Sequence, residues 1–163
     1  MKLFFKYYQS PIGKLKLIAS TKGLFAILWP NDNDARIKLS VAIEDNSHHV
    51  LKVTEKQLTQ YFNGKRKAFD LPLDLQGTGF QKSAWRALLK IPYGKTWSYK
   101  KQAELIGDFK KARAVGAANG RNPISIVIPC HRVIGSNGEL TGFAAGLKTK
   151  KFLLELEEKI NQE

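Results

Sequence analysis

One short segment combines residue types that could carry nucleophilic chemistry. Cys130, the one cysteine of the chain, is followed directly by His131 and Arg132. The thiolate is the reactive form of cysteine, and neighbouring cations lower the pKa of a thiol from its usual value of about 8.5. A free cysteine is more often a buried and inert core residue. The adjoining imidazole and guanidinium favour the reactive interpretation, so Cys130 is the candidate nucleophile.

The chain around Cys130 limits how these side chains can meet. Residues 124–128 are mostly apolar and lie between two prolines, which predicts a buried strand. Successive side chains of a strand point to opposite faces, so His131 reaches the sulfur only through a helix start or a bridging water. An imidazole base also needs a carboxylate on its other nitrogen. The residues alone leave four candidates open: Glu139, Glu155, Glu157 and Glu158.

The charge distribution points to a polyanionic partner. The 163 residues hold 27 basic and 14 acidic side chains, a net charge of +13, and residues 80–132 alone hold 11 basic and 2 acidic ones. This concentration favours nucleic acid over a membrane surface, although composition alone is equally compatible with a solvated basic surface. One cysteine excludes an internal disulfide and a cysteine-based zinc cluster. The chain shows no membrane-spanning run and no signal peptide, so we expect a cytoplasmic protein.

The first part of the chain, residues 1–76, alternates short strands and turns. We expect strands within residues 3–30, a helix from Val50 to the Asn63-Gly64 pair, and a further short strand over residues 68–73. These elements predict a small α/β domain.

The second part, residues 77–163, is predicted to be mostly helical. An amphipathic helix from Phe80 ends before Pro92, and Thr96 or Ser98 can cap a helix that runs to Leu105. A tight turn then leads to a helix over residues 110–119. Two helices joined by a short glycine turn outline a helix-turn-helix, a weak signal when taken alone.

The second helix of this pair has an unusual surface. It offers Ala112, Ala114 and Ala117 where a helix that reads bases would carry long polar side chains, and its one long cation is Arg113. Small residues allow a backbone to approach a duplex closely, which suits a narrow groove or displacement of a base. They also allow tight helix packing. The lysines at the start of this helix, Lys110 and Lys111, are expected to contact phosphates.

Four stretches of the sequence resemble one family. The sequence Pro129-Cys130-His131-Arg132-Val133 resembles the active-site signature of the O6-alkylguanine-DNA alkyltransferases. Similar stretches precede it at residues 113–123 and follow it at residues 142–157, and residues 10–15 resemble the start of the family's amino-terminal domain. The resemblance covers essentially the whole chain. It implies an α/β (α+β) architecture, with a ribonuclease-H-like domain over 1–76 and a winged-helix-like catalytic domain over 77–163.

The resemblance also implies roles for individual residues. Cys130 would accept the alkyl group, His131 would act as a water-mediated base, and Glu157 would orient His131. Asn122 would brace the turn that carries the cysteine, and Tyr99 would face the flipped nucleotide.

Further roles concern DNA and the substrate. Arg113 would fill the gap left by the extruded base, beside the small residues named above. The substrate pocket is expected to include Val133, Phe143, Ala144, Lys150 and Trp85. Because Ala144 has no side-chain donor, contact with the O6 atom would rely on a backbone N–H.

The implied function is DNA repair by irreversible transfer of an alkyl group from O6-alkylguanine, and from O4-alkylthymine, to Cys130. The implied partner is double-stranded DNA that contains the lesion; we expect no cofactor, no metal and a monomer. Three alternatives remain open from the residues: a non-catalytic lesion sensor of the same architecture, a sequence-specific DNA-binding regulator, and a thiol hydrolase that turns over many times.

Overall fold

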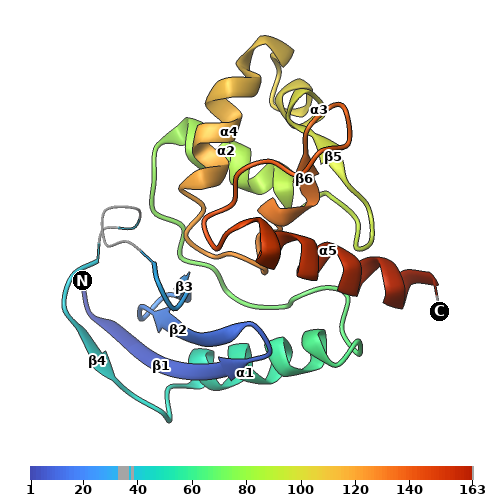
Figure 1. Cartoon of the computed structure of the whole chain (residues 1–163). Coiled ribbons are helices and arrows are strands. Elements are labelled where there is room, and N and C mark those ends of the chain that lie inside the picture. The colour runs from blue at the N-terminus through green and yellow to red at the C-terminus, as the bar shows by residue number, and fades with distance from the viewer. Residues whose placement is uncertain (33–36, 38, 163) are drawn as a thin grey trace. The chain divides into compact units, whose positions relative to one another are not determined.

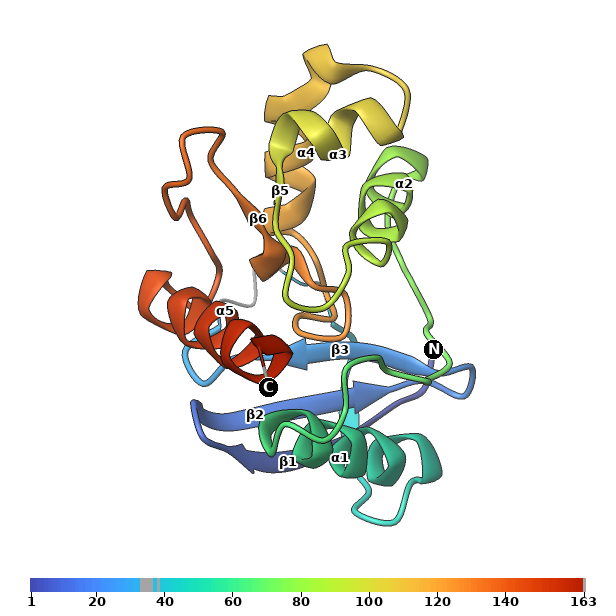
Figure 2. The same ribbon diagram turned by 90° about the vertical axis from the view of Figure 1, so that its right-hand side faces the viewer.

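The computed structural model describes residues 1–32, 37 and 39–162 of the chain. These residues form two compact units, Met1–Gln76 and Gly77–Glu163. Figures 1 and 2 show the helices and strands of each unit from two directions. Among the described residues, no helix is long and apolar enough to cross a membrane.

The first unit is a four-stranded sheet with one helix. The strands lie in the order β3-β2-β1-β4, antiparallel except that β1 and β4 run parallel. Helix α1 lies along one face of this sheet (Figure 2). The strands expected within residues 3–30 and the helix after them are confirmed. The bounds of these confirmed elements are β1 Leu3–Ser10, β2 Gly13–Ala19, β3 Leu24–Leu28 and α1 His49–Phe62. The short strand β4 Ala42–Glu44 was not predicted.

The strand predicted over residues 68–73 is wrong. Only an isolated bridge between Leu24 and Leu73 forms there. The backbone N–H and C=O of Asp70 instead bond to the side-chain amide of Gln57, at 2.9 Å each. A side chain on α1 thus takes the bonds that a neighbouring strand would have supplied.

The second unit carries the predicted helix pair. Of the two expected caps, Thr96 and Ser98, it is Ser98 that accepts a hydrogen bond from the Lys101 N–H and caps α3. Thr78 forms a capping box at the start of α2. Strand β5 pairs parallel with β6. The elements are α2 Gly79–Leu88, β5 Trp97–Ser98, α3 Tyr99–Leu105, the 3₁₀ helix η1 Phe109–Lys111, α4 Ala112–Gly120, the 3₁₀ helix η2 Cys130–Arg132, β6 Val133–Ile134 and α5 Leu147–Gln162.

Buried polar side chains hold the three helices α2, α3 and α4 together. Gln102 and Asn119 exchange two hydrogen bonds of 2.9 and 2.8 Å, and Gln102 also donates to the Ala84 carbonyl. The indole Nε1 of Trp85 donates to the Ala118 carbonyl at 2.8 Å. Fully satisfied buried networks of this kind fix one arrangement of the helices. The orientation of α4 relative to α2 and α3 is therefore fixed by these hydrogen bonds.

Trp85 packs in the interior of the second unit. This side chain is 2% exposed and its polar atom is used between α2 and α4. Trp85 is therefore a core residue between these two helices, and its assignment to the substrate pocket stays a prediction.

Candidate active site

A tight buried turn carries the cysteine. The strand predicted over residues 124–128 is wrong: Ile128 N–H bonds back to the Ile124 carbonyl at 2.9 Å, and Ile126 has a positive φ of 75°. The Asn122 side chain closes this turn, since its Oδ1 accepts from Ile124 N–H and its Nδ2 donates to the Ile128 carbonyl. The apolar run is buried as its composition predicts, but the asparagine amide replaces a partner strand.

The chain then enters a 3₁₀ helix at the cysteine. After Pro129, residues Cys130, His131 and Arg132 form η2, and all three are buried. Cys130 keeps 7% of its surface exposed. On a strand, the side chains of Cys130 and His131 would point to opposite faces. In the 3₁₀ helix they do not, so His131 can lie on the same side as the sulfur.

One glutamate of the four candidates meets the histidine. Nε2 of His131 lies 2.6 Å from Oε2 of Glu157, which α5 contributes. Arg132 donates to the same carboxylate from Nε at 2.7 Å and from Nη2 at 3.1 Å. Burial acts to raise the pKa of Glu157, but His131 and Arg132 outweigh it and lower this pKa to about 2. Glu157 is therefore a buried carboxylate at neutral pH.

His131 is held as a neutral imidazole. Complete burial lowers its pKa, Glu157 acts in the opposite direction, and the Arg132 and Lys150 cations lower the pKa further. With Nε2 bonded to a carboxylate, the ring proton lies on Nε2 and the lone pair on Nδ1. Nδ1 is buried and has no hydrogen-bond partner among the described residues. That nitrogen is the one able to accept a proton.

Lys150 supplies a buried cation near the sulfur. Its Nζ donates to the Val133 carbonyl at 2.6 Å and to the Thr141 carbonyl at 3.2 Å. Burial lowers the pKa of Lys150, and a negative charge on Cys130 opposes this. The same Thr141 bonds through its hydroxyl to the Tyr99 hydroxyl at 2.6 Å. Thr141 was missed by sequence reasoning, since a threonine in a polar loop carries no signal.

The surface of α4 is small and basic, as its sequence predicts. Val115, Ala118 and Asn119 face inward, which leaves the other side of the helix to solvent. Ala112 is half-buried, and the exposed residues are Arg113, Ala114 and Ala117, with Lys110 and Lys111 before them. Phe143 is half-buried and Ala144 exposed in the segment between β6 and α5.

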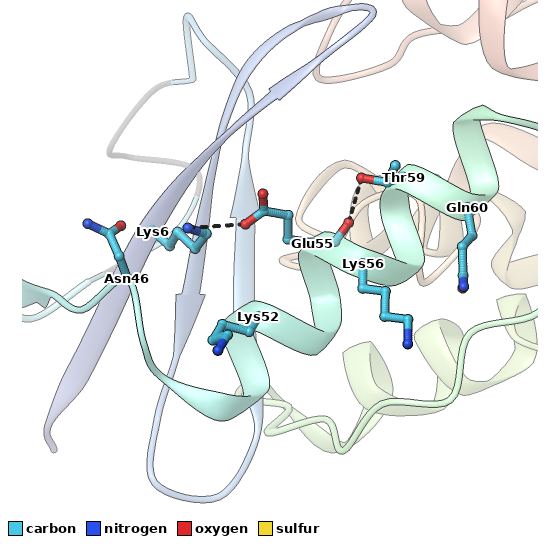
Figure 3. Close-up of a pocket in the computed structure, with 7 residues that line it drawn as sticks. All are labelled: Lys6, Asn46, Lys52, Glu55, Lys56, Thr59 and Gln60. Atoms are coloured by element: carbon cyan, nitrogen blue, oxygen red, sulfur yellow. Dashed lines mark hydrogen bonds and ion pairs between the residues drawn. The ribbon is translucent and has the colours of Figure 1, made fainter.

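A hollow of about 500 Å³ in the first unit holds none of these residues (Figure 3). It lies between α1 and β1 and includes an ion pair of 3.1 Å between Lys6 and Glu55. It is open to solvent and is lined by Lys6, Asn46, Lys52, Glu55, Lys56, Thr59 and Gln60. Among the described residues, no cluster of histidine, cysteine or carboxylate side chains could hold a metal ion.

The buried ionic network predicts loss of stability in acid. The unfolded chain protonates His131 near its ordinary pKa of 6.5 and Glu157 near 4.5, whereas folding lowers both values. Stability is therefore complete above about pH 6.5 and falls as the pH drops through 4.5 towards 2. For Glu157 the loss is about 3 kcal/mol. Urea unfolding at several pH values measures it.

A matched pair of variants controls this measurement. Glu157→Gln should be less stable at pH 7 and should lack the part of the acid loss between pH 4.5 and 2 that the Glu157 carboxylate causes, while the part that His131 causes remains. Glu155→Gln removes an exposed carboxylate of the same helix and should follow the unaltered protein. Equal acid sensitivity in all three proteins would contradict the network as the source of the effect.

Comparison with known proteins gives two family matches that together span nearly the whole chain. Residues 3–75 match the ribonuclease-like domain of 6-O-methylguanine DNA methyltransferase, and residues 79–159 match its DNA binding domain. A methylated-DNA–protein-cysteine methyltransferase of Methanosarcina barkeri is 47% identical over 156 residues, which cover 96% of this chain and 98% of that protein. The crystal structure of Mycobacterium tuberculosis OGT in complex with DNA is 42% identical with a TM-score of 0.87, and covers 98% of this chain and 94% of that one.

Proposed function

Because the chain belongs to the 6-O-methylguanine DNA methyltransferase family, we propose that it repairs DNA by transferring the alkyl group of O6-alkylguanine to Cys130. The observation that carries this proposal is the arrangement of the cysteine at the start of η2, with Lys150 near the sulfur and the His131–Glu157 pair beside it. A thiol so placed has a cation to stabilise its thiolate and a neutral imidazole to receive its proton.

The transfer is a single displacement. The thiol proton passes through a water to Nδ1 of His131, and the thiolate attacks the alkyl carbon. A C–S bond forms while the C–O bond to guanine breaks, and the leaving purine takes a proton, for which the Tyr99 hydroxyl is the donor. Lys150 and Val133 lie beside the site, and Phe143 and Ala144 are assigned to the pocket. The lesion supplies the alkyl group, so the reaction needs no cofactor.

The helix-turn-helix delivers the damaged nucleotide. An O6 atom is out of reach inside a duplex, so the nucleotide must rotate out of the stack, at a cost of a few kcal/mol. The exposed alanines of α4 let the backbone approach the minor groove, and Arg113 fills the space that the base leaves. The structure of the Mycobacterium tuberculosis relative in complex with DNA supports DNA as the partner. Lys110 and Lys111 add phosphate contacts that do not depend on sequence.

The thioether product ends the reaction. A thiolate is a poor leaving group from an unactivated alkyl carbon, so water at neutral pH does not break the C–S bond of the product. Each molecule therefore acts once. All assigned residues lie within residues 77–163, to which we assign catalysis.

A stoichiometric mass measurement tests this function. The protein is incubated with a duplex containing O6-methylguanine and then weighed intact, and its peptides are sequenced. We expect one added methyl group, located on Cys130, and at most one repaired lesion per protein molecule. Tight binding of the lesion without a mass change would instead establish the non-catalytic sensor. Many turnovers on an ester or amide would establish the thiol hydrolase.

A further inference from the structure

Arg132 is the most completely bonded side chain of the site, and the reaction as proposed above gives it no role. It is 6% exposed. Its Nε and Nη2 donate to the two oxygens of Glu157, its Nη1 donates to the Ile91 carbonyl at 2.8 Å, and its Cζ lies 5.6 Å from the centre of the Tyr93 ring. The guanidinium is thus fixed by a carboxylate, a carbonyl and an aromatic face at once.

The fork of Arg132 determines where the Glu157 carboxylate lies. Oε2 of Glu157 is shared between Nη2 of Arg132 and Nε2 of His131, at 3.1 and 2.6 Å. Oε1 accepts from Nε of Arg132 at 2.7 Å. Paired planar bonds between guanidinium and carboxylate fix both distance and orientation. The imidazole of His131 therefore bonds to a carboxylate oxygen whose position is fixed by Arg132.

We propose that Arg132 is a positioning residue for alkyl transfer: it aims Glu157 at His131 and keeps His131 unprotonated until the thiol of Cys130 gives up its proton. The proposal rests on the function argued above and adds a second task to the Cys130-His131-Arg132 segment. Arg132 touches neither the alkyl group nor the sulfur in this account, and acts through Glu157.

The buried charges around His131 explain why Arg132 keeps its imidazole neutral. Arg132 and Lys150 are the cations that act on His131, and Glu157 is the anion that Arg132 contacts. The Lys150 cation also faces Cys130, whose negative charge it stabilises. The Tyr93 hydroxyl is held neutral because burial and Glu157 raise its pKa. With Arg132 present, Glu157 is already balanced and a proton on His131 would be an extra buried positive charge. Without Arg132, a proton on His131 would balance Glu157. Such an imidazolium has no lone pair on Nδ1 for the thiol proton.

Two variants and a pH profile test the proposal. Arg132→Met removes both the positive charge and the two hydrogen bonds to Glu157. Arg132→Lys keeps a positive charge but cannot form the paired bonds to both carboxylate oxygens. We expect the acidic limb of the single-turnover rate to move to higher pH by at least about one unit in the methionine variant, so that the rate on that limb falls about tenfold. The lysine variant should shift in the same direction by less, and it carries the test if the methionine variant does not fold.

A matched control and a second measurement complete the design. Lys151→Met removes an exposed cation of α5 and should leave the acidic limb in place. NMR titration of the His131 imidazole reads its protonation without any alkyl transfer, so it remains decisive even if the proposed activity fails. We expect His131 to titrate at higher pH in both Arg132 variants. A folded Arg132 variant whose imidazole titration and acidic limb coincide with those of the unaltered protein would overturn the proposal.

Discussion

Serine at position 130 will leave a protein that binds alkylated duplex DNA and transfers no alkyl group above the uncatalysed background. The hydroxyl is close in size to the thiol, so the tight turn closed by Asn122 and the network of His131 and Glu157 should form unchanged. A serine hydroxyl is far less acidic than a thiol and is a weak nucleophile without a base that removes its proton outright. Intact mass measures the transfer, and fluorescence anisotropy measures the binding.

The outcome separates the proposed reaction from its alternatives. Unaltered DNA affinity together with complete loss of transfer assigns the chemistry to one sulfur atom. A sequence-specific regulator would bind one particular duplex and would be indifferent to Cys130→Ser. A methyl group recovered on another residue of the variant would show that Cys130 is not the acceptor. The unaltered protein at the same salt concentration is the reference, because affinities for DNA depend strongly on salt.

The same physical cause explains both segments whose secondary structure the sequence misjudged. Residues 68–73 and 124–128 carry apolar residues typical of strands, yet their backbone groups bond to the side-chain amides of Gln57 and Asn122. An amide can offer a donor and an acceptor much as a neighbouring strand does. Periodicity shows that a segment is buried, but it does not show what will satisfy its backbone.

Local signals were sufficient where neighbours in sequence decide the structure. The cap at Ser98 depends on the N–H of Lys101, three residues along the chain, and it formed as expected. The partner of His131 depends on a residue 26 positions away in α5. From the residues alone, four glutamates were equally good, and only the family resemblance singled out Glu157. For Trp85 the sequence could not show that its indole bonds to the Ala118 carbonyl, because an aromatic side chain fits a pocket wall and a helix interface equally well by composition.

Alanine at position 113 should slow repair in duplex DNA by roughly 30- to 150-fold, which corresponds to losing about 2 to 3 kcal/mol of support for the rotated nucleotide. Arg113 is exposed on α4, so its removal leaves the packing of Val115 and Ala118 intact. A free O6-alkylguanine base needs no unstacking, and its reaction with Cys130 should change by less than about twofold. Single-turnover rates on both substrates measure the difference.

Lys111→Ala is the matched control for this comparison, because it removes an exposed cation two residues earlier without removing the side chain assigned to the gap. A lysine on a phosphate contributes affinity that excess protein can restore. At saturating protein, the Lys111 variant should therefore repair the duplex at nearly the unaltered rate, whereas the Arg113 variant should stay slow. If both variants recover at saturation, Arg113 serves only to bind the backbone. If the Arg113 variant loses equal activity on the free base, its effect reaches Cys130 itself, and the nucleotide is held out by other means.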